Sequence, residues 1–590
     1  MVHLGLWKKN VCTSSIRIWH LLSGFAVLSV TVVLAFIPFY IRISHSSKSD
    51  PDLGILNMPS TLHQTKEMTL FFIVEIKVYD AEFHIRWFNA SPNIYEREIL
   101  GINDQFPCPR IVVEQGTIIN IRVINQLFEE TIIHWHGLHQ RNTTDMDGVP
   151  GVTQCSIMPN QSYVYRFHTA NQSGTYWYHS HHAIQYGDGL KGILVIKDPN
   201  DPWKSFYDDE EILELTDWYH TPVHIYLVRY LYPGTLEPIP DRALINGIGQ
   251  FNCTLHENCS YYRVSMDNGK SKRLRIINTS IYARITLTID QHQMRLIEAD
   301  GIYLDGNTHV RALRLGPGQR YSVIVSGKEN SSDNYWIRAT MHPFVNNKLE
   351  YNYSNEETVL AILQYNHERT IPSIESFSND DQLIINQSLI DGEIFSDQPN
   401  LVLLNDTRYT LPTNETIKTL IFNFQHKGRR PGYFYLNNHT FIHPINQTFL
   451  SFILYNHSEE LEWPSTFRLE SGQIYDLIIN NIDYTSHPFH LHGHHLWILA
   501  QGYANESYIY HTNISYPTKP VYRDTVTVNP FSYMIVRFQA DNPGIWMMHC
   551  HNDWHLQLHM SAVFIESKEM IRHVYSDENR TDSIPLKCQS

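Results

Sequence analysis

The chain has 590 residues, 42% of them hydrophobic and 12% aromatic, which is typical of folded globular domains. Acidic residues outnumber basic ones, 60 against 45, and the formal net charge of −15 excludes a broad basic surface for nucleic acid or anionic lipid. A chain of this length is too long for one core and should form three or four domains.

A long apolar run occupies residues 18–41. Its 24 residues are enough to cross a bilayer core of ~30 Å as a helix. Two lysines and an arginine precede it, so the positive-inside rule places residues 1–17 in the cytosol and the remainder outside, as in a single-pass type II membrane protein. A cleaved signal peptide would give a secreted protein instead, but its apolar region is usually shorter. We therefore predict a transmembrane signal anchor at 18–41 and a linker at 42–65.

Glycosylation sequons and cysteines agree with an extracellular or luminal compartment. The Asn-x-Ser/Thr sequon occurs about eighteen times between Asn89 and Asn579 and never before the apolar run. Cys12 lies on the cytosolic side, and an odd number of cysteines remains for disulfides in an oxidising compartment, so one thiol is expected to stay unpaired. These cysteines are Cys108, Cys155, Cys253, Cys259 and Cys588.

A strand pattern occurs three times along the chain. In each copy a glycine opens a run rich in Ile and Val, and an asparagine follows nine residues after the glycine. The three runs are Gly116 to Asn125, Gly269 to Asn278 and Gly472 to Asn481. Each has the partial alternation of a strand in a β-sandwich.

A second pattern recurs near the end of each copy, where a short aromatic run follows a turn. Ser173-Gly174-TYWY-His179 and Pro543-Gly544-IWMM-His549 end in histidine, whereas the middle copy, Asp333-Asn334-YWIR-Ala339, does not. The two patterns together predict three homologous antiparallel β-sandwiches with few helices. The predicted domains are 66–200, 205–367 and 400–567, with a linker at 368–399 and a C-terminal tail at 568–590.

Paired histidines occur in the first and last predicted domains. Side chains two residues apart on a strand point to the same face, so each His-x-His pair can serve two adjacent metals. Eight imidazoles suit a three-metal cluster, whereas zinc, the simpler alternative, rarely needs so many ligands. The pairs are His134 and His136, His179 and His181, His490 and His492, and His549 and His551.

A thiolate stands between the histidines of the last pair. Cys550, His487, His555 and Met560 form the set of two imidazoles, one thiolate and one thioether that suits copper in electron transfer. Because Cys550 lies between His549 and His551, this site would be covalently joined to the cluster. The middle domain holds no candidate ligand and is expected to be a spacer.

At these residues the chain resembles the multicopper oxidases, and it is most similar to their laccase branch. The resemblance covers all three domains through four motifs: His134-Trp135-His136-Gly137, Tyr178-His179-Ser180-His181, His487-Pro488-Phe489-His490-Leu491-His492-Gly493-His494, and His549-Cys550-His551-Asn552-Asp553-Trp554-His555. It implies an all-β fold of three consecutive cupredoxin-like, Greek-key β-sandwich domains. It also implies four copper ions per chain and four-electron reduction of O₂ to water.

The resemblance further implies how the ligands are divided among the copper ions. His487, Cys550, His555 and Met560 would form type 1 copper, where electrons enter. His134 and His490 would hold type 2 copper. The type 3 pair would be held by His136, His179, His181, His492, His549 and His551. Cys155 resembles a cysteine that pairs with the C-terminal tail, so Cys155 and Cys588 are the expected disulfide.

Three acidic residues are matched to functional carboxylates of the family. Asp147 and Asp553 would assist proton delivery at the cluster. Asp217, in Leu215-Thr216-Asp217-Trp218-Tyr219-His220, is similar to a laccase acid beside a type 1 histidine that accepts a proton from a phenol. Ferroxidases of the family tend to carry Glu there as an iron ligand. Each of the three acids has a merely structural role as its alternative.

The electron donor is the least determined part of the prediction. The leading hypothesis is a membrane-anchored, laccase-like oxidase of diphenols or aromatic amines outside the cell. The first alternative is a ferroxidase or cuprous oxidase that acts in metal homeostasis on Fe(II) or Cu(I). The second is a non-catalytic copper-binding ectodomain.

Overall fold

The computed structural model describes fourteen stretches of the chain, and most of the three predicted domains lies within them. They are residues 40–45, 73–232, 235–252, 259–342, 357–368, 371–372, 402–404, 409–413, 416–427, 432–444, 446–455, 463–503, 516–578 and 580–588. The predicted span at 18–41 lies outside them except for its last two residues, which belong to strand β1 (Tyr40–His45). No helix within the described stretches has the length and apolar character to cross a membrane.

The first domain consists of two sheets with strand orders β1-β2-β5-β7, with β3 beside β2, and β4-β9-β8-β6. Its strands are β2 (Ile73–Ala90), β3 (Arg97–Ile102), β4 (Ile111–Glu114), β5 (Ile118–Asn125), β6 (Ile133–His136), β7 (Ser162–His168), β8 (Gly174–Ser180) and β9 (Lys191–Lys197). Its 3-10 helices are η2 (Thr144–Met146), η3 (Gln185–Asp188) and η4 (Lys204–Phe206).

The middle domain repeats this plan with sheets β11-β10-β13-β19-β15-β16, with β17 beside β15, and β12-β21-β20-β14-β18. Its elements are β10 (Asp209–Trp218), α1 (Val223–Tyr230), β11 (Arg242–Ile245), β12 (Tyr262–Ser265), β13 (Ser271–Asn278), β14 (Arg284–Ile289), β15 (Met294–Ala299), β16 (Ile302–Tyr303), β17 (His309–Val310), β18 (Ala312–Leu315), β19 (Arg320–Ser326), β20 (Tyr335–His342) and β21 (Glu357–Gln364).

The third domain has sheets β23-β22-β25-β30-β27-β28 and β24-β32-β31-β26-β29. Its strands are β22 (Ile417–Lys427), β23 (Tyr433–Leu436), β24 (Thr466–Leu469), β25 (Ile474–Asn481), β26 (His487–Leu491), β27 (Leu496–Tyr503), β28 (Tyr522–Arg523), β29 (Thr525–Val528), β30 (Ser532–Gln539), β31 (Gly544–Cys550) and β32 (Ser561–Glu566). Its helices are α3 (Phe449–Tyr455), α4 (Asp553–Gln557), α5 (Lys568–Asp577) and η7 (Thr581–Ser583).

The asparagine that closes each repeated strand pattern has the same structural role in all three domains. Asn125, Asn278 and Asn481 are fully buried at the ends of β5, β13 and β25. In each copy the side-chain oxygen accepts from the backbone N–H two residues later, and the side-chain amide donates to at least two backbone carbonyls. A buried turn therefore keeps its backbone groups satisfied, which explains why an asparagine recurs there.

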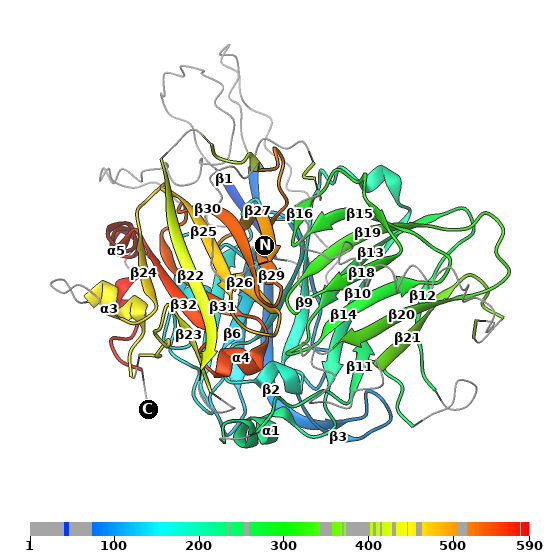
Figure 1. Ribbon diagram of the computed structural model, residues 1–590, viewed down its shortest axis with the longest axis horizontal. Helices are drawn as coiled ribbons and strands as arrows, with labels where there is room; N and C mark the ends of the chain where they lie inside the picture. Colours follow the sequence, from blue (N-terminus) through cyan, green and yellow to red (C-terminus); the bar gives the residue numbers. More distant parts are fainter. Residues whose placement is uncertain are drawn as a thin grey trace, which may run out of the picture.

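The three domains meet around one central region. In Figure 1 the green middle domain lies to the right and the orange to red third domain to the left. Contacts join the first and third domains directly, as between Asp147 and His492, and the middle and third domains, as between Arg320 and Asp524. The prediction of three β-domains with few helices is confirmed for the described residues, and its exact domain boundaries stay predictions.

Candidate metal centres

A buried site in the third domain brings together Cys550, His487 and His555. Cys550 ends β31, His487 begins β26, and His555 lies on α4, which Asn552 caps by accepting from the backbone N–H of Trp554. The thiol sulfur is 3.7 Å from Nδ1 of His487 and 3.5 Å from Nδ1 of His555, and the two Nδ1 atoms are 3.0 Å apart. Three soft or borderline donor atoms therefore converge on one point.

The same site favours a thiolate and places Met560 beside it. Burial opposes ionisation of Cys550, but the two imidazoles, led by His555, outweigh it and lower the pKa of the thiol to about 7. The Met560 side chain is fully buried, and its main chain accepts from the Cys550 N–H and donates to the His555 carbonyl. A thiolate, two imidazoles and a neighbouring thioether are the donor set of a blue-copper site.

Acidic groups hold the outer nitrogens of both imidazoles in this site. Asp483 Oδ2 lies 3.2 Å from Nε2 of His487. Glu237, from the middle domain, has Oε1 2.5 Å from Nε2 of His555, where the Asn552 amide nitrogen is also 3.1 Å away. Such outer contacts orient metal-binding imidazoles and leave Nδ1 for the metal.

Eight further histidines from the first and third domains form one cluster between these domains. Register pairs His134 with His179 on β6 and β8, and His490 with His549 on β26 and β31. The other member of each His-x-His pair lies two residues away, on the same strand or just beyond its end. All eight are buried: His134, His136, His179, His181, His490, His492, His549 and His551.

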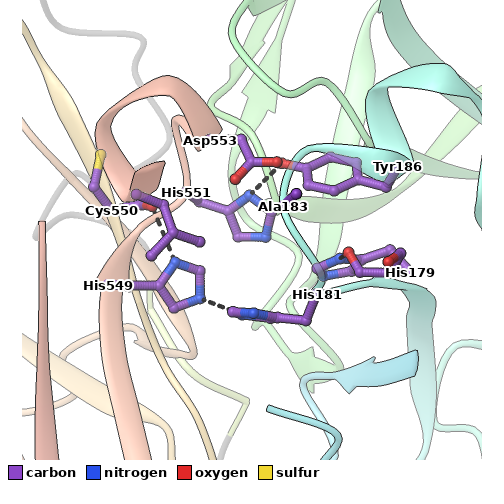
Figure 2. Close-up of a pocket in the computed structure, with 10 residues that line it drawn as sticks. His179, His181, Ala183, Tyr186, His549, Cys550, His551 and Asp553 are labelled. Carbon is purple, nitrogen blue, oxygen red and sulfur yellow. Dashed lines mark hydrogen bonds between the residues drawn. The ribbon is translucent and has the colours of Figure 1, made fainter. Parts of the chain in front are cut away.

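The nitrogens of this cluster approach one another both within the third domain and across its boundary with the first. His549 Nε2 lies 3.3 Å from Nε2 of His181 and 3.1 Å from Nε2 of His492, and His551 Nε2 lies 3.2 Å from Nδ1 of His136. Figure 2 shows His549 facing His181, with Tyr186 and Asp553 beside His551. The structure thus brings together all eight imidazoles that the sequence singled out.

Hydrogen bonds to backbone carbonyls determine which nitrogen is free in four of these imidazoles. Nδ1 lies 2.7 to 3.0 Å from a carbonyl oxygen in His134, His179, His490 and His549. Because a carbonyl only accepts, Nδ1 carries the proton and Nε2 keeps its lone pair. In His134, His179 and His490, Nε2 is buried and has no hydrogen-bond partner. A lone pair buried in this way is explained by a metal ion.

The charge state of the cluster also fits metal ions. Burial first, and then repulsion between neighbouring imidazoles, hold the pKa values of five of these histidines well below the usual range, and that of His549 at about 3. Neutral imidazole is the form that binds metal. The structure is therefore consistent with the copper ligands predicted from the sequence.

Asp147 and Asp553 both lie at the cluster. Asp147 Oδ2 is 2.9 Å from Nδ1 of His492, its backbone carbonyl accepts from His134, and its Oδ1 has no hydrogen-bond partner. Asp553 borders the same pocket as His179, His181, His549 and His551. Burial raises the pKa of Asp553 to about 8, so this carboxyl can hold a proton near neutral pH.

Asp217 does not contact His555, and the role expected for it at the donor site stays a prediction. Its buried carboxylate accepts from the backbone N–H groups of Ile281, Tyr282 and Ala283 at 2.9 to 3.0 Å, which makes it a structural acceptor at a domain corner. The acid at His555 is Glu237. No local pattern in Leu236-Glu237-Pro238 points to it, since the contact joins residues 318 positions apart.

Other cysteines and histidines take structural roles. Cys155 and Cys588 form the expected disulfide, Cys259 is also disulfide-bonded, and Cys108 is a buried free thiol, in agreement with one unpaired cysteine. His494 contacts Glu566, and His495 lies 2.8 Å from His139 and 3.0 Å from the Asp300 carbonyl. His494 and His495 are therefore packed residues that contact protein groups outside the candidate metal sites.

Family models described as multicopper oxidase match three consecutive segments, residues 84–201, 209–368 and 433–570. Together they cover more than half of the chain, one model for each sandwich. The middle domain matches its family model although it supplies none of the eleven candidate imidazole and thiolate ligands.

Individual proteins of known name and structure agree with these matches. The chain is 33% identical to the iron transport multicopper oxidase fio1 of Schizosaccharomyces pombe, over 82% of this chain and 75% of that protein. It is also 33% identical to laccase-1 of Cryptococcus neoformans var. grubii, over 84% and 81%. The crystal structure of Fet3p, a multicopper oxidase that functions in iron import, matches with a TM-score of 0.74 and 26% identity over 86% of this chain and 96% of Fet3p. The laccase of Botrytis aclada matches with a TM-score of 0.71 and 26% identity over 86% and 91%.

Proposed function

Because this chain belongs to the multicopper oxidase family, a group of copper-dependent oxidoreductases that use O₂, we propose that it oxidises Fe(II) at the Cys550 site. Four copper ions supply the chemistry when bound, since one accepts single electrons from the donor and the other three reduce O₂ to water. A non-catalytic ectodomain is not retained as an alternative.

The observation that carries the proposal is the contact between Glu237 and His555. The Glu237 side chain is 12% exposed, so its carboxylate joins the buried imidazole to the protein surface. A carboxylate is a hard oxygen ligand that suits Fe(II), and its charge favours Fe(III), the product. An iron ion held by Glu237 would be one side chain away from His555, which gives a short path for the electron.

We further propose that His487, Cys550, His555 and Met560 hold type 1 copper, and that His134 and His490 hold type 2 copper. The type 3 pair would be held by His136, His179, His181, His492, His549 and His551. The convergence of His487, Cys550 and His555 supports the type 1 assignment, and the buried Nε2 atoms without hydrogen-bond partners in His134, His179 and His490 support metal ligation in the cluster. Cys550 then connects the two sites, because its peptide neighbours His549 and His551 belong to the cluster.

We propose that Asp147 and Asp553 assist proton delivery during O₂ reduction. Asp147 Oδ1 has no hydrogen-bond partner and lies 3.4 Å from Nδ1 of His134, which places a carboxyl oxygen directly at the cluster. Asp553 borders the pocket that His181 and His549 line, where its raised pKa lets it release a proton near neutral pH.

Oxidation of diphenols or aromatic amines is the second candidate function. The laccase-1 match supports it, and Glu237 could equally accept the proton of a phenol as its electron leaves. Steady-state O₂ consumption with Fe(II), Cu(I), catechols and aromatic amines separates the candidates. A kcat/KM for Fe(II) above that for every organic donor supports the ferroxidase, and the reverse order supports the laccase.

A further inference from the structure

A turn of the middle domain touches the histidine cluster, although this domain supplies none of its ligands. Gly318 has φ of +84°, and a Cβ at this position would lie 2.9 Å from Cδ2 of His551 and 3.0 Å from Cε1 of His136. Real Cβ atoms hardly ever approach other atoms so closely, so any side chain at residue 318 would push both imidazoles. The backbone of residue 318 is itself held, because its N–H donates to the Asn278 carbonyl.

The arginine two residues later joins all three domains beside the same imidazoles. The fully buried guanidinium of Arg320 donates two parallel bonds of 2.7 Å to the Asp524 carboxylate, and its Nε donates to the Thr175 carbonyl at 2.9 Å. Asp524 Oδ1 lies 3.3 Å from Nε2 of His136 and 3.5 Å from Nδ1 of His490. A bidentate pair fixes both the position and the plane of the carboxylate.

Gln319, which lies between Gly318 and Arg320, is connected to the cluster imidazoles through Thr525. The Gln319 side-chain oxygen accepts from the Gly316 N–H at 2.7 Å, and its amide donates to the Thr525 carbonyl at 3.1 Å. The Thr525 hydroxyl lies 3.3 Å from Nε2 of His136 and 3.2 Å from Nδ1 of His490. Three consecutive middle-domain residues thus contact the cluster directly or through one third-domain residue.

From these contacts we infer that residues 318–320, the cluster turn, are positioning residues that set His136, His490 and His551 for the trinuclear copper site. The middle domain is therefore part of the O₂-reducing centre and not the spacer that the sequence suggested. Gly318 positions by steric contact, because its missing side chain leaves the space beside the two rings. Arg320 positions through Asp524, since a buried carboxylate without its guanidinium would be unstable in that place.

This inference rests on the proposed copper ligation, and Gly318→Ala tests it. The matched control is Gly116→Ala, because Gly116 has a similar φ of +82° and a Cβ added there would meet no atom within 4 Å. Both variants place an alanine in the left-handed backbone region and carry the same strain, but only the alanine at residue 318 contacts the cluster. Copper content and O₂ reduction of the wild-type protein test the proposed function independently of these variants.

For Gly318→Ala we expect the blue absorption of type 1 copper to remain, while bound copper falls below four per chain and the near-ultraviolet absorption of the coupled type 3 pair decreases. Its melting temperature should fall more in the copper-loaded form than in the copper-free form, where the imidazoles can move. Gly116→Ala should keep all copper and show the same shift in both forms. Equal copper content, spectra and melting shifts in the two variants would overturn the inference.

Arg320→Lys provides a second test if Gly318→Ala does not fold. Lysine keeps the charge but cannot form the bidentate contact with Asp524. We expect anaerobic reduction of type 1 copper by the donor to be unchanged, the electron paramagnetic resonance signal of type 2 copper to change, and reoxidation by O₂ to slow about tenfold or more. Reoxidation and a type 2 signal like those of the wild type would overturn the role of Arg320.

Discussion

Glu237 in the middle domain lies 2.5 Å from His555 in the third domain, and it is the acid nearest to the imidazole where electrons are proposed to enter. Its substitution by alanine removes the proposed iron ligand without touching Cys550 or His487. Loss of one charged contact costs about 1.5–3 kcal/mol, or roughly 10- to 100-fold in kcat/KM for Fe(II). We expect a catechol to lose about threefold or less, since it needs no metal ligand there. Parallel assays of Glu237→Ala and Glu237→Gln with both donors measure the difference, and an equal loss for both donors would contradict iron binding by Glu237.

Asp217→Asn should affect stability and leave donor preference unchanged. The asparagine amide cannot accept from all three backbone N–H groups that the carboxylate now satisfies. We expect the free energy of unfolding to fall by about 1–3 kcal/mol, measured by denaturant titration of the purified variant. The ratio of kcat/KM for Fe(II) to that for a catechol should equal that of the wild type. A changed ratio of the two kcat/KM values would indicate that Asp217 acts at the donor site.

Cys550→Ser should separate the two metal centres. The serine hydroxyl stays protonated and cannot replace the thiolate, so blue absorption and donor oxidation should disappear. The eight cluster imidazoles do not depend on the sulfur, so type 2 and type 3 copper should remain at about three ions per chain. Copper analysis with optical and paramagnetic resonance spectra checks this result. Loss of all copper would show that Cys550 also maintains the cluster.

His224 should give the protein a pH-dependent component of stability. Asp188 accepts from the Val223 N–H at the start of α1 and lies 3.3 Å from Nδ1 of His224, and this contact raises the pKa of His224. The stabilising contribution is therefore complete below about pH 6.5 and disappears as the pH rises through the raised pKa. Because His224 is half exposed, the effect should be less than about 1 kcal/mol. Melting temperatures from pH 5 to 9 should decline less over this window in His224→Gln than in the wild type.

Cys588→Ser should release the C-terminal tail from the first domain. The disulfide joins residues 433 positions apart, and removal of a native disulfide typically costs about 2–4 kcal/mol. We expect a lower melting temperature, with Cys155→Ser giving the same decrease because both variants remove one bond. The double variant should match either single variant. A further decrease in the double variant would indicate that the free thiols have separate effects.

The convergence of the candidate ligands was predictable from the sequence because they occur in short motifs. The spacing of the His-x-His pairs defines which imidazoles share a strand face, and Cys550 lies within the last pair. The three β-domains were predictable from their repeated strands and the asparagines that end them.

Residues that act across domain boundaries were not predictable in this way. Glu237, Asp524 and Arg320 reach the metal centres from distant parts of the chain, and only folding brings them there. The backbone contacts of Asp217 were not predictable either, because a short motif does not show which way a carboxylate at a strand end will point. The contact of Gly318 with His136 and His551 was not predictable either, because it depends on how the domains pack.

Because the cluster is divided between the first and third domains, domain docking and copper loading are expected to occur in a defined order. During synthesis, a ribosome completes the first four cluster histidines more than 300 residues before it reaches His490, and His551 comes last. The first domain alone therefore offers an incomplete set of ligands. With the ligation proposed above, the trinuclear copper site would load only after the third domain docks, and a chain with one misfolded domain would not receive its full complement of metal. Copper occupancy thus reports whether the whole molecule has assembled.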